Sequence, residues 1–111
     1  MRLATVVLFM LAGTIAKAQV ADGVYEFPAC TAAPVSDGRI QIADGEIRFY
    51  ESTCQLGAGK SVDGLDGALI HAATCTGEGE TWGMTILLMP GFDGGLIRVE
   101  SGLALTYAAC D

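Results

Sequence analysis

Two runs of alternating apolar and polar residues flank an Asp-Gly pair between positions 39 and 50. Alternation with a period of two is typical of β-strands that bury one face. Asp-Gly is a preferred pair for the two-residue turn that joins antiparallel strands. If Asp44 and Gly45 form that turn, Ile42 faces Ile47 and one face is apolar. The pattern therefore predicts a β-hairpin in which the turn and the burial pattern favour the same register.

A second hairpin is predicted near the C-terminal end, where two registers compete. A two-residue turn pairs Arg98 with Leu105 and mixes polar and apolar side chains on each face. A three-residue loop over 100–102, with its glycine in the left-handed conformation, pairs Val99 with Leu103 and gives one apolar face. We therefore expect the three-residue loop.

Further alternating runs predict strands at residues 24–27, 68–76 and 81–89. The last run places four residues on one face: Trp82, Met84, Ile86 and Leu88. No segment has a convincing helical period, and Gly-rich turns separate the runs. About seven short strands with such turns indicate an all-β fold, a small antiparallel β-barrel or sandwich. A barrel is favoured because closure removes exposed strand edges.

The N-terminal segment has the pattern of a signal peptide, which implies export from the cytoplasm. Arg2 supplies a positive start, residues 3–15 are apolar, and Ala16-Lys17-Ala18 forms a cleavage site before Gln19. The apolar run of about 13 residues is shorter than the roughly 20 that cross a bilayer. We therefore expect a signal peptide over residues 1–18 and no membrane anchor after its removal.

The expected mature chain, residues 19–111, is long enough for one small domain. The six basic residues of the sequence include Arg2 and Lys17, so four remain against thirteen acidic residues, a net charge near −9. This charge argues against nucleic acid and anionic membranes as partners. A basic protein is the partner that such a surface would attract.

Four cysteines lie in the expected mature chain: Cys30, Cys54, Cys75 and Cys110. An oxidising compartment favours two structural disulfides, and the absence of a C-x-x-C motif argues against a zinc or redox site. In a simple meander of strands, Cys30 and Cys54 lie at the same rim, which favours Cys30–Cys54 and Cys75–Cys110. The second bond requires the Gly-rich segment 56–67 to cross the barrel mouth, so the connectivity stays open.

The remaining polar motifs support neither a metal nor a cofactor. Asp-Gly occurs six times, but no segment has the ligand spacing of a calcium loop, and tight turns favour the same pair. The single histidine, His71, lies in an alternating run without a serine motif that would make it a catalytic base. We interpret it as a hydrogen-bonded strand residue.

One cluster is unusual: the run 77–82 places Glu78 and Glu80 beside Trp82 at an expected hairpin tip. Two carboxylates next to a large aromatic side chain suit a basic partner or a sugar. The same carboxylates, two apart on one strand face, are in principle an acid/base pair. A single small domain offers little room for the deep cleft of a glycosidase, so we favour binding over catalysis.

Several stretches resemble small exported proteins of Gram-negative bacteria that have no assigned function. The resemblance rests on four stretches: Asp37 to Cys54, Cys75 to Trp82, Asp93-Gly-Gly-Leu-Ile and Tyr107-x-x-Cys110. It implies an exported, disulfide-linked domain but no mechanism.

A fainter resemblance is to the periplasmic inhibitors of C-type lysozyme, which are small disulfide-linked β-barrels acting through acidic loops and a Ser-Gly motif. Ser101-Gly102 ahead of Tyr107, together with the acidic composition, is similar, whereas the rest of that family's pattern is not matched. The resemblance implies that Ser101 and Gly102 contact a basic enzyme.

We therefore predict a non-enzymatic periplasmic binding or interaction protein without a cofactor or bound metal. The predicted binding residues are Glu78, Glu80, Trp82, Ser101 and Gly102. An inhibitor of C-type lysozyme is the alternative, and a small hydrolase using Glu78 and Glu80 is a remote one. The sequence leaves the partner and the oligomeric state open.

Overall fold

The computed structural model describes residues 20–111, so the predicted signal peptide and its cleavage between Ala18 and Gln19 lie outside the described residues. The described chain forms nine strands and one short 3-10 helix: β1 (Gly23–Glu26), β2 (Arg39–Ala43), β3 (Glu46–Arg48), β4 (Thr53–Leu56), β5 (Lys60–Val62), β6 (Leu65–Gly77), β7 (Glu80–Pro90), η1 (Phe92–Gly94), β8 (Leu96–Glu100) and β9 (Leu103–Cys110). Among these residues no helix has the length and apolar character needed to cross a membrane.

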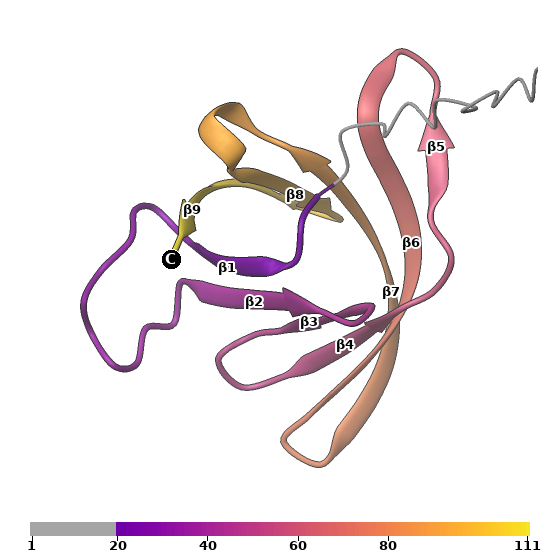
Figure 1. Ribbon diagram of the computed structural model, residues 1–111. Helices are drawn as coiled ribbons and strands as arrows, with labels where there is room; N and C mark the ends of the chain where they lie inside the picture. Colours follow the sequence, from indigo (N-terminus) through magenta and orange to yellow (C-terminus); the bar gives the residue numbers. More distant parts are fainter. Residues whose placement is uncertain (1–19) are drawn as a thin grey trace, which may run out of the picture.

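Eight of these strands close into an antiparallel barrel, as the favoured sequence prediction stated. Neighbouring strands pair in the order β4-β3-β2-β1-β9-β8-β7-β6, and a further pairing of β4 with β6 closes the ring. The strand β5 lies outside the ring, paired only with β6 (Figure 1). The 13 residues of β6 make room for both partners, because β5 pairs with its first half and β4 with its second half.

Inward-facing side chains from every barrel strand form the core. The buried cluster consists of Tyr25, Ile40, Ile42, Ile47, Cys54, Ala73, Cys75, Ile86, Leu88, Leu96 and Tyr107. Because side chains alternate along a strand, the outward positions between these residues are mostly polar or small. Barrels of eight strands have an interior narrow enough for side chains to fill, and these residues fill it here.

The hairpin β2–β3 has the register that its sequence predicts. Ile42 pairs with Ile47, and both side chains are buried in the barrel. Asp44 and Gly45 both have positive φ, 53° and 78°, as a type I′ turn requires.

The hairpin β8–β9 corrects the sequence prediction of a three-residue loop. Val99 pairs with Ala104 and Arg98 with Leu105, so the turn contains only Ser101 and Gly102. The two-residue turn was rejected from the sequence because it pairs Arg98 with Leu105 and so mixes polar and apolar side chains on each face. In the structure the Arg98 side chain points into the barrel, and the residue is only 6% exposed.

Two aromatic rings and two polar groups accommodate this buried guanidinium. Arg98 donates from Nε to the hydroxyl oxygen of Tyr107 at 2.9 Å and forms an ion pair with Glu100. Its Cζ lies 4.9 Å from the ring centroid of Phe49 and 5.7 Å from that of Tyr107. A cation over aromatic faces is stabilised by the ring quadrupole. The barrel therefore has a charged residue inside its core near one rim.

The disulfide pairing predicted from the sequence is also wrong. The bonds are Cys30–Cys110 and Cys54–Cys75. The prediction assumed that Cys54 ends the third strand, but the chain reverses just before it, with Phe49 N–H donating to the Ser52 carbonyl. Cys54 therefore lies near the start of β4, which pairs with β6 and places Cys54 directly opposite Cys75.

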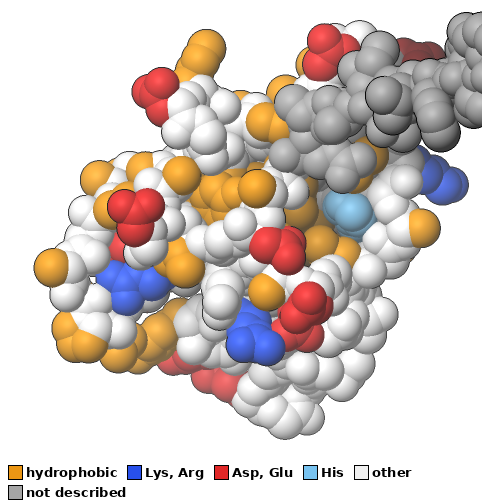
Figure 2. Space-filling model, in the orientation of Figure 1, with side chains coloured by type: hydrophobic (Ala, Val, Ile, Leu, Met, Phe, Trp, Pro, Cys, Tyr) orange, Lys and Arg blue, Asp and Glu red, His pale blue; other side chains and the backbone are white. Residues whose placement is uncertain are grey.

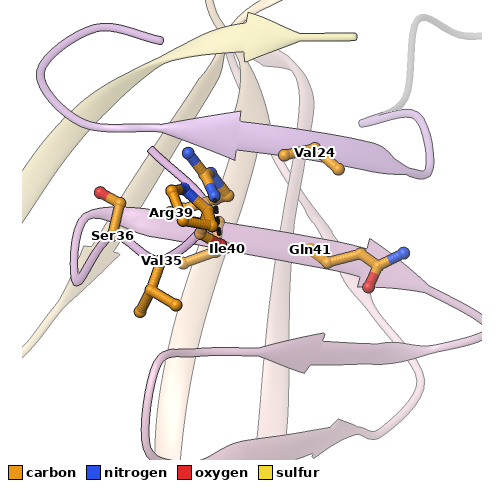
Figure 3. A pocket seen from close by; sticks show the side chains of 7 residues that line it. Val24, Val35, Ser36, Arg39, Ile40 and Gln41 are labelled. Carbon is orange, nitrogen blue, oxygen red and sulfur yellow. Dashed lines mark hydrogen bonds between the residues drawn. The ribbon is translucent and has the colours of Figure 1, made fainter. Parts of the chain in front are cut away.

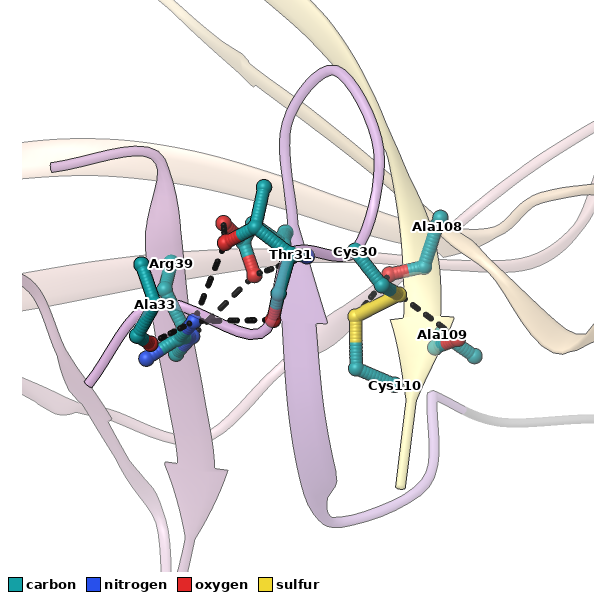
Figure 4. Close-up of a disulfide and its surroundings, with 8 residues drawn as sticks. Cys30, Thr31, Ala33, Arg39, Ala108, Ala109 and Cys110 are labelled. Atoms are coloured by element: carbon teal, nitrogen blue, oxygen red, sulfur yellow. Dashed lines mark hydrogen bonds and ion pairs between the residues drawn. A yellow bond between two sulfur atoms is a disulfide. The ribbon is translucent and has the colours of Figure 1, made fainter. Parts of the chain in front are cut away.

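The loop of residues 27–38 folds back over the outer wall of the barrel, where the Cys30–Cys110 bond fixes it to β9 (Figure 4). Beneath it lies Glu26, an outward-facing residue of β1 that is only 1% exposed. The Glu26 carboxylate accepts hydrogen bonds from the Thr31 hydroxyl at 2.7 Å and from Arg39 Nε at 3.1 Å. These contacts satisfy a charge that would otherwise be costly to bury.

Hydrogen bonds from the side chains of Thr31 and Ser36, with smaller contributions from Thr31 N–H and Arg39, lower the pKa of Glu26 from 4.5 to about 2. A carboxyl group whose pKa is lowered on folding stabilises the fold at pH values above its ordinary pKa. This contribution is lost as the pH falls through the lowered pKa. We expect Glu26→Gln to lower the melting temperature at pH 7 and to flatten its decline between pH 4.5 and 2. Thermal melts across this range test the prediction, with Glu80→Gln as an exposed control. An unchanged acid profile in Glu26→Gln would contradict it.

Candidate functional site

The hairpin β6–β7 extends past the end of β8 at one rim of the barrel. β7 pairs with β6 along most of its length but with β8 only from Leu87 to Pro90. The β8–β9 turn is therefore level with Ile86, and Glu80 lies about six residues, or roughly 20 Å, further along the strand direction. In Figure 1 this part of the hairpin reaches the bottom of the view, away from β8.

The turn of this hairpin contains an unfavourable backbone conformation. Glu78 has φ 50° and is followed by Gly79 with φ 78°. Glycine and asparagine adopt the left-handed region readily, whereas a glutamate side chain there is uncommon. Such conformations cost on the order of 1 kcal/mol or more and gather at functional sites. Glu78 is therefore not the residue that turn stability alone would favour.

A second carboxylate, that of Glu51, lies next to Glu78. The connection between β3 and β4 packs closely on β6 because Gly77 has no side chain. A Cβ added to Gly77 would lie 2.7 Å from the carbonyl oxygen of Glu51 and 2.9 Å from Cβ of Ser52. We call the group of Glu51, Glu78 and Glu80 the acidic tip.

The Glu78 side chain affects the ionisation of the neighbouring Glu51. The pKa of Glu51 is raised above its ordinary value, because Glu78 hydrogen-bonds to its protonated form and repels its ionised form. The ion pairs among residues 20–111 are Arg39–Glu26, Arg48–Glu46 and Arg98–Glu100, and none involves the acidic tip. The tip therefore concentrates negative charge that no described cation neutralises. On the face in Figure 2, acidic side chains are more widespread than basic ones.

An exposed aromatic side chain lies beside the acidic tip in each of the two segments that form it, the hairpin β6–β7 and the connection between β3 and β4. Trp82 follows Glu80 on β7 and is 40% exposed, although it lies directly opposite the buried Cys75. Tyr50, next to Glu51, is 55% exposed. Exposed Trp and Tyr beside charges are the residue types that most often dominate protein interfaces.

The structure therefore brings together three of the five predicted binding residues: Glu78, Glu80 and Trp82. Ser101 and Gly102 form the β8–β9 turn, which is roughly 20 Å from Glu80 along the strand direction. The expectation that both glutamates lie on one strand face is wrong, because Glu78 is a turn residue and β7 begins at Glu80.

Glu51 was missed by sequence reasoning, since nothing local connects it to Glu78. The only signal that points to it is the cysteine pair: if Cys54 is bonded to Cys75, their neighbours three residues away also approach each other. The pairing favoured from the sequence was Cys30–Cys54 and Cys75–Cys110, which does not bring Glu51 toward Glu78.

Two further depressions lie elsewhere on the described surface. A shallow groove of about 240 Å³ runs between the loop of residues 27–38 and the strands β1 and β2, lined by Val24, Val35, Arg39 and Gln41 among others (Figure 3). Arg39 is already occupied by Glu26 and by the carbonyl oxygens of the loop. The groove therefore results from the packing of the loop against the strands, and few polar groups in it are free to bind a ligand.

The second depression, of about 180 Å³, is at the barrel mouth opposite the acidic tip and is lined by Ile42, Leu56, Leu69 and His71 among others. His71 Nδ1 lies 2.8 Å from the carbonyl oxygen of Gly57, so this nitrogen donates a hydrogen bond. His71 is thus a hydrogen-bonded strand residue, as we interpreted it from the sequence.

Within residues 20–111 no group of three or more His, Cys, Asp or Glu side chains is arranged to hold a metal ion. Comparisons with protein-family models, curated proteins and solved structures find no match for this chain. The two resemblances stated from the sequence stay predictions, and a function has to be argued from the fold and the acidic tip.

Proposed function

We propose that this protein is a non-enzymatic binding module that presents the acidic tip and Trp82 to a basic protein partner. The proposal rests on one observation at Glu78. Its backbone conformation is unfavourable, and its carboxylate and that of the neighbouring Glu51 repel each other. A residue that lowers stability in two ways is expected where function requires it.

Charge and fold support the same proposal. Beyond the three ion pairs, the ten remaining acidic residues of the described chain are all exposed, with Lys60 as the one other basic side chain among residues 20–111. Such a surface attracts basic partners over long distances. We place this binding in the periplasm, in agreement with two disulfides, which persist in oxidising compartments.

The first experiment measures binding of the oxidised protein to a C-type lysozyme, a basic protein, by titration calorimetry. We expect binding at about 0.02 M salt that weakens strongly at about 0.5 M, because salt screens the charges that attract the partner. Substituting Glu78→Gln together with Glu80→Gln should weaken binding at least about tenfold. Lack of binding to lysozyme and to a second basic protein would contradict the proposal.

A matched control separates the acidic tip from net charge. Asp63→Asn with Asp66→Asn removes the same charge in the β5–β6 turn and at the start of β6, the opposite end of β6 from the acidic tip. We expect this control to change affinity less than about twofold. Equal losses in both double variants would mean that total charge, and not the acidic tip, attracts the partner.

Glu78→Gly tests the stability argument. Glycine adopts φ 50° without strain and removes the carboxylate next to Glu51. We expect a higher melting temperature at pH 7 together with weaker binding of the basic partner. A variant with lower stability would show that Glu78 is a structural residue.

Inhibition of C-type lysozyme is the narrower form of the proposal that the sequence resemblance favours. It requires the enzyme to contact Ser101 and Gly102 in addition to the acidic tip. Lysozyme activity that is unaffected by the protein, or inhibition unchanged by Ser101→Ala, would leave only the general binding function. A hydrolase using Glu78 and Glu80 remains the remote alternative, tested by turnover in the Glu78→Gln, Glu80→Gln variant.

A further inference from the structure

The part of β7 that extends past the end of β8 has one free edge. β6 covers the other edge from Glu80 to Leu88, whereas β8 pairs only from Leu87 onward. Among the described residues no other strand hydrogen-bonds to the backbone of Glu80–Ile86 on the β8 side. Such an edge presents a row of unpaired N–H and C=O groups to which a further strand can bind.

Natural edge strands usually carry features that prevent pairing, and this segment has few of them. The sequence Glu-Thr-Trp-Gly-Met-Thr-Ile contains neither proline nor lysine, and its register with β6 is continuous, without a bulge. Its one charged residue, Glu80, lies at the end. Trp82 is 40% exposed and Met84 half-buried, so the edge also leaves apolar surface uncovered.

We infer that this edge of β7 pairs antiparallel with the same edge of β7 in a second copy of this chain, in a register centred on Gly83. The segment is self-complementary in that register. Trp82 then lies opposite Met84 of the second copy, and Thr81 lies opposite Thr85. Aromatic–methionine and Thr–Thr pairs are favourable across strands.

Charge favours the antiparallel register over the parallel one. Parallel pairing in register places Glu80 opposite Glu80 of the second copy, which is destabilising. In the antiparallel register the two Glu80 residues lie at opposite ends, roughly 20 Å apart at about 3.3 Å per residue. A two-fold axis through Gly83 gives an isologous contact that closes on itself as a dimer. The acidic tips then lie at opposite ends of the paired segment, with one Glu80 at each end.

The test uses Gly83, the residue that meets its own copy at the axis. The nearest atom to a Cβ added there is the Ala73 carbonyl oxygen at 3.8 Å, so a side chain fits without disturbing the fold. Sedimentation velocity over a range of concentrations should show a dimer for the unmodified protein. Gly83→Lys and Gly83→Glu should each weaken dimerisation at least about tenfold, because like charges face each other. An equimolar mixture of the two variants should restore a dimer by placing Lys opposite Glu.

Thr74→Lys is the matched control, since Thr74 pairs with Gly83 but belongs to β6, one strand away from the edge. It should leave the dimer unchanged. A protein that is monomeric at every concentration, a Gly83→Lys dimer of undiminished affinity, or a mixture that stays monomeric would each overturn the inference. Near-ultraviolet circular dichroism shows whether the variants keep the fold. A peptide of another protein that binds this edge while the chain stays monomeric would likewise overturn the self-pairing.

Salt dependence separates this inference from the proposed function. Two copies that each carry a charge near −9 repel, so high salt should strengthen the dimer, whereas it should weaken binding of a basic partner. Binding of the basic partner is therefore measured at low protein concentration, where Trp82 is not covered by a second copy. The dimer can therefore be absent while the basic partner binds, and the basic partner can fail to bind while the dimer forms.

Discussion

Replacing Arg98 by alanine should lower the free energy of unfolding by about 3–5 kcal/mol, the usual effect of removing one partner from a buried ion pair. The substitution leaves Glu100 without its cation and the Tyr107 hydroxyl without its donor. It also opens a space against the ring of Phe49, over which the guanidinium lies. Chemical denaturation of the oxidised protein, followed by Trp82 fluorescence, measures this loss.

The double variant Arg98→Met with Glu100→Gln distinguishes the charge pair from the packing around it. Methionine fills much of the volume of the arginine stem, and the paired change leaves no uncompensated charge. Replacing both charges of a buried pair is often nearly neutral. We therefore expect the double variant to lose much less stability than Arg98→Ala. A loss below about 1 kcal/mol in Arg98→Ala would show that the guanidinium is well solvated through the rim.

The second large effect concerns the disulfide that fixes the loop of residues 27–38. Cys30 and Cys110 are separated by 80 residues. Restricting so long a loop in the unfolded chain is worth about 4–5 kcal/mol in the chain-entropy model. We expect Cys30→Ala with Cys110→Ala to lose stability of this order while keeping the Cys54–Cys75 bond, which mass spectrometry can verify. A loss below about 1 kcal/mol would contradict the entropic account.

The same variant should also change the environment of Glu26. Its carboxylate is buried because the loop supplies Thr31 and covers it. Without the Cys30–Cys110 bond the loop is free to leave the wall, so the pKa of Glu26 should rise from about 2 toward its ordinary value. Carboxyl chemical shifts followed through an NMR pH titration measure this change. A pKa that stays near 2 would mean that Arg39 and the backbone hold the loop alone.

The register of the hairpin β2–β3 follows from its local sequence pattern alone. Its turn residues require positive φ, and its alternation identifies the buried face, so two independent signals give one register. The β8–β9 hairpin has the same kind of alternation, yet the prediction was wrong there. Its buried face contains Arg98, and a pattern that treats every arginine as exposed selects the other register.

Only those residues of the acidic tip that are close together in sequence were predicted. Glu78, Glu80 and Trp82 are near one another in sequence, so their proximity could be read directly. Glu51 lies next to Glu78 only because β4 pairs with β6 across the closing seam of the barrel. The free edge of β7 likewise depends on the unequal lengths of β7 and β8, which no local motif encodes.

The sequence by itself determined the all-β class, the Asp44-Gly45 turn, the presence of two disulfides and the net negative charge. These properties follow from residue type and short-range alternation. Only the tertiary structure decided which cysteines are bonded, which face of β8 is buried and which carboxylates meet. The physical reason is that closure of the barrel pairs strands far apart in sequence, and a core can bury an arginine once aromatic rings and a carboxylate surround it.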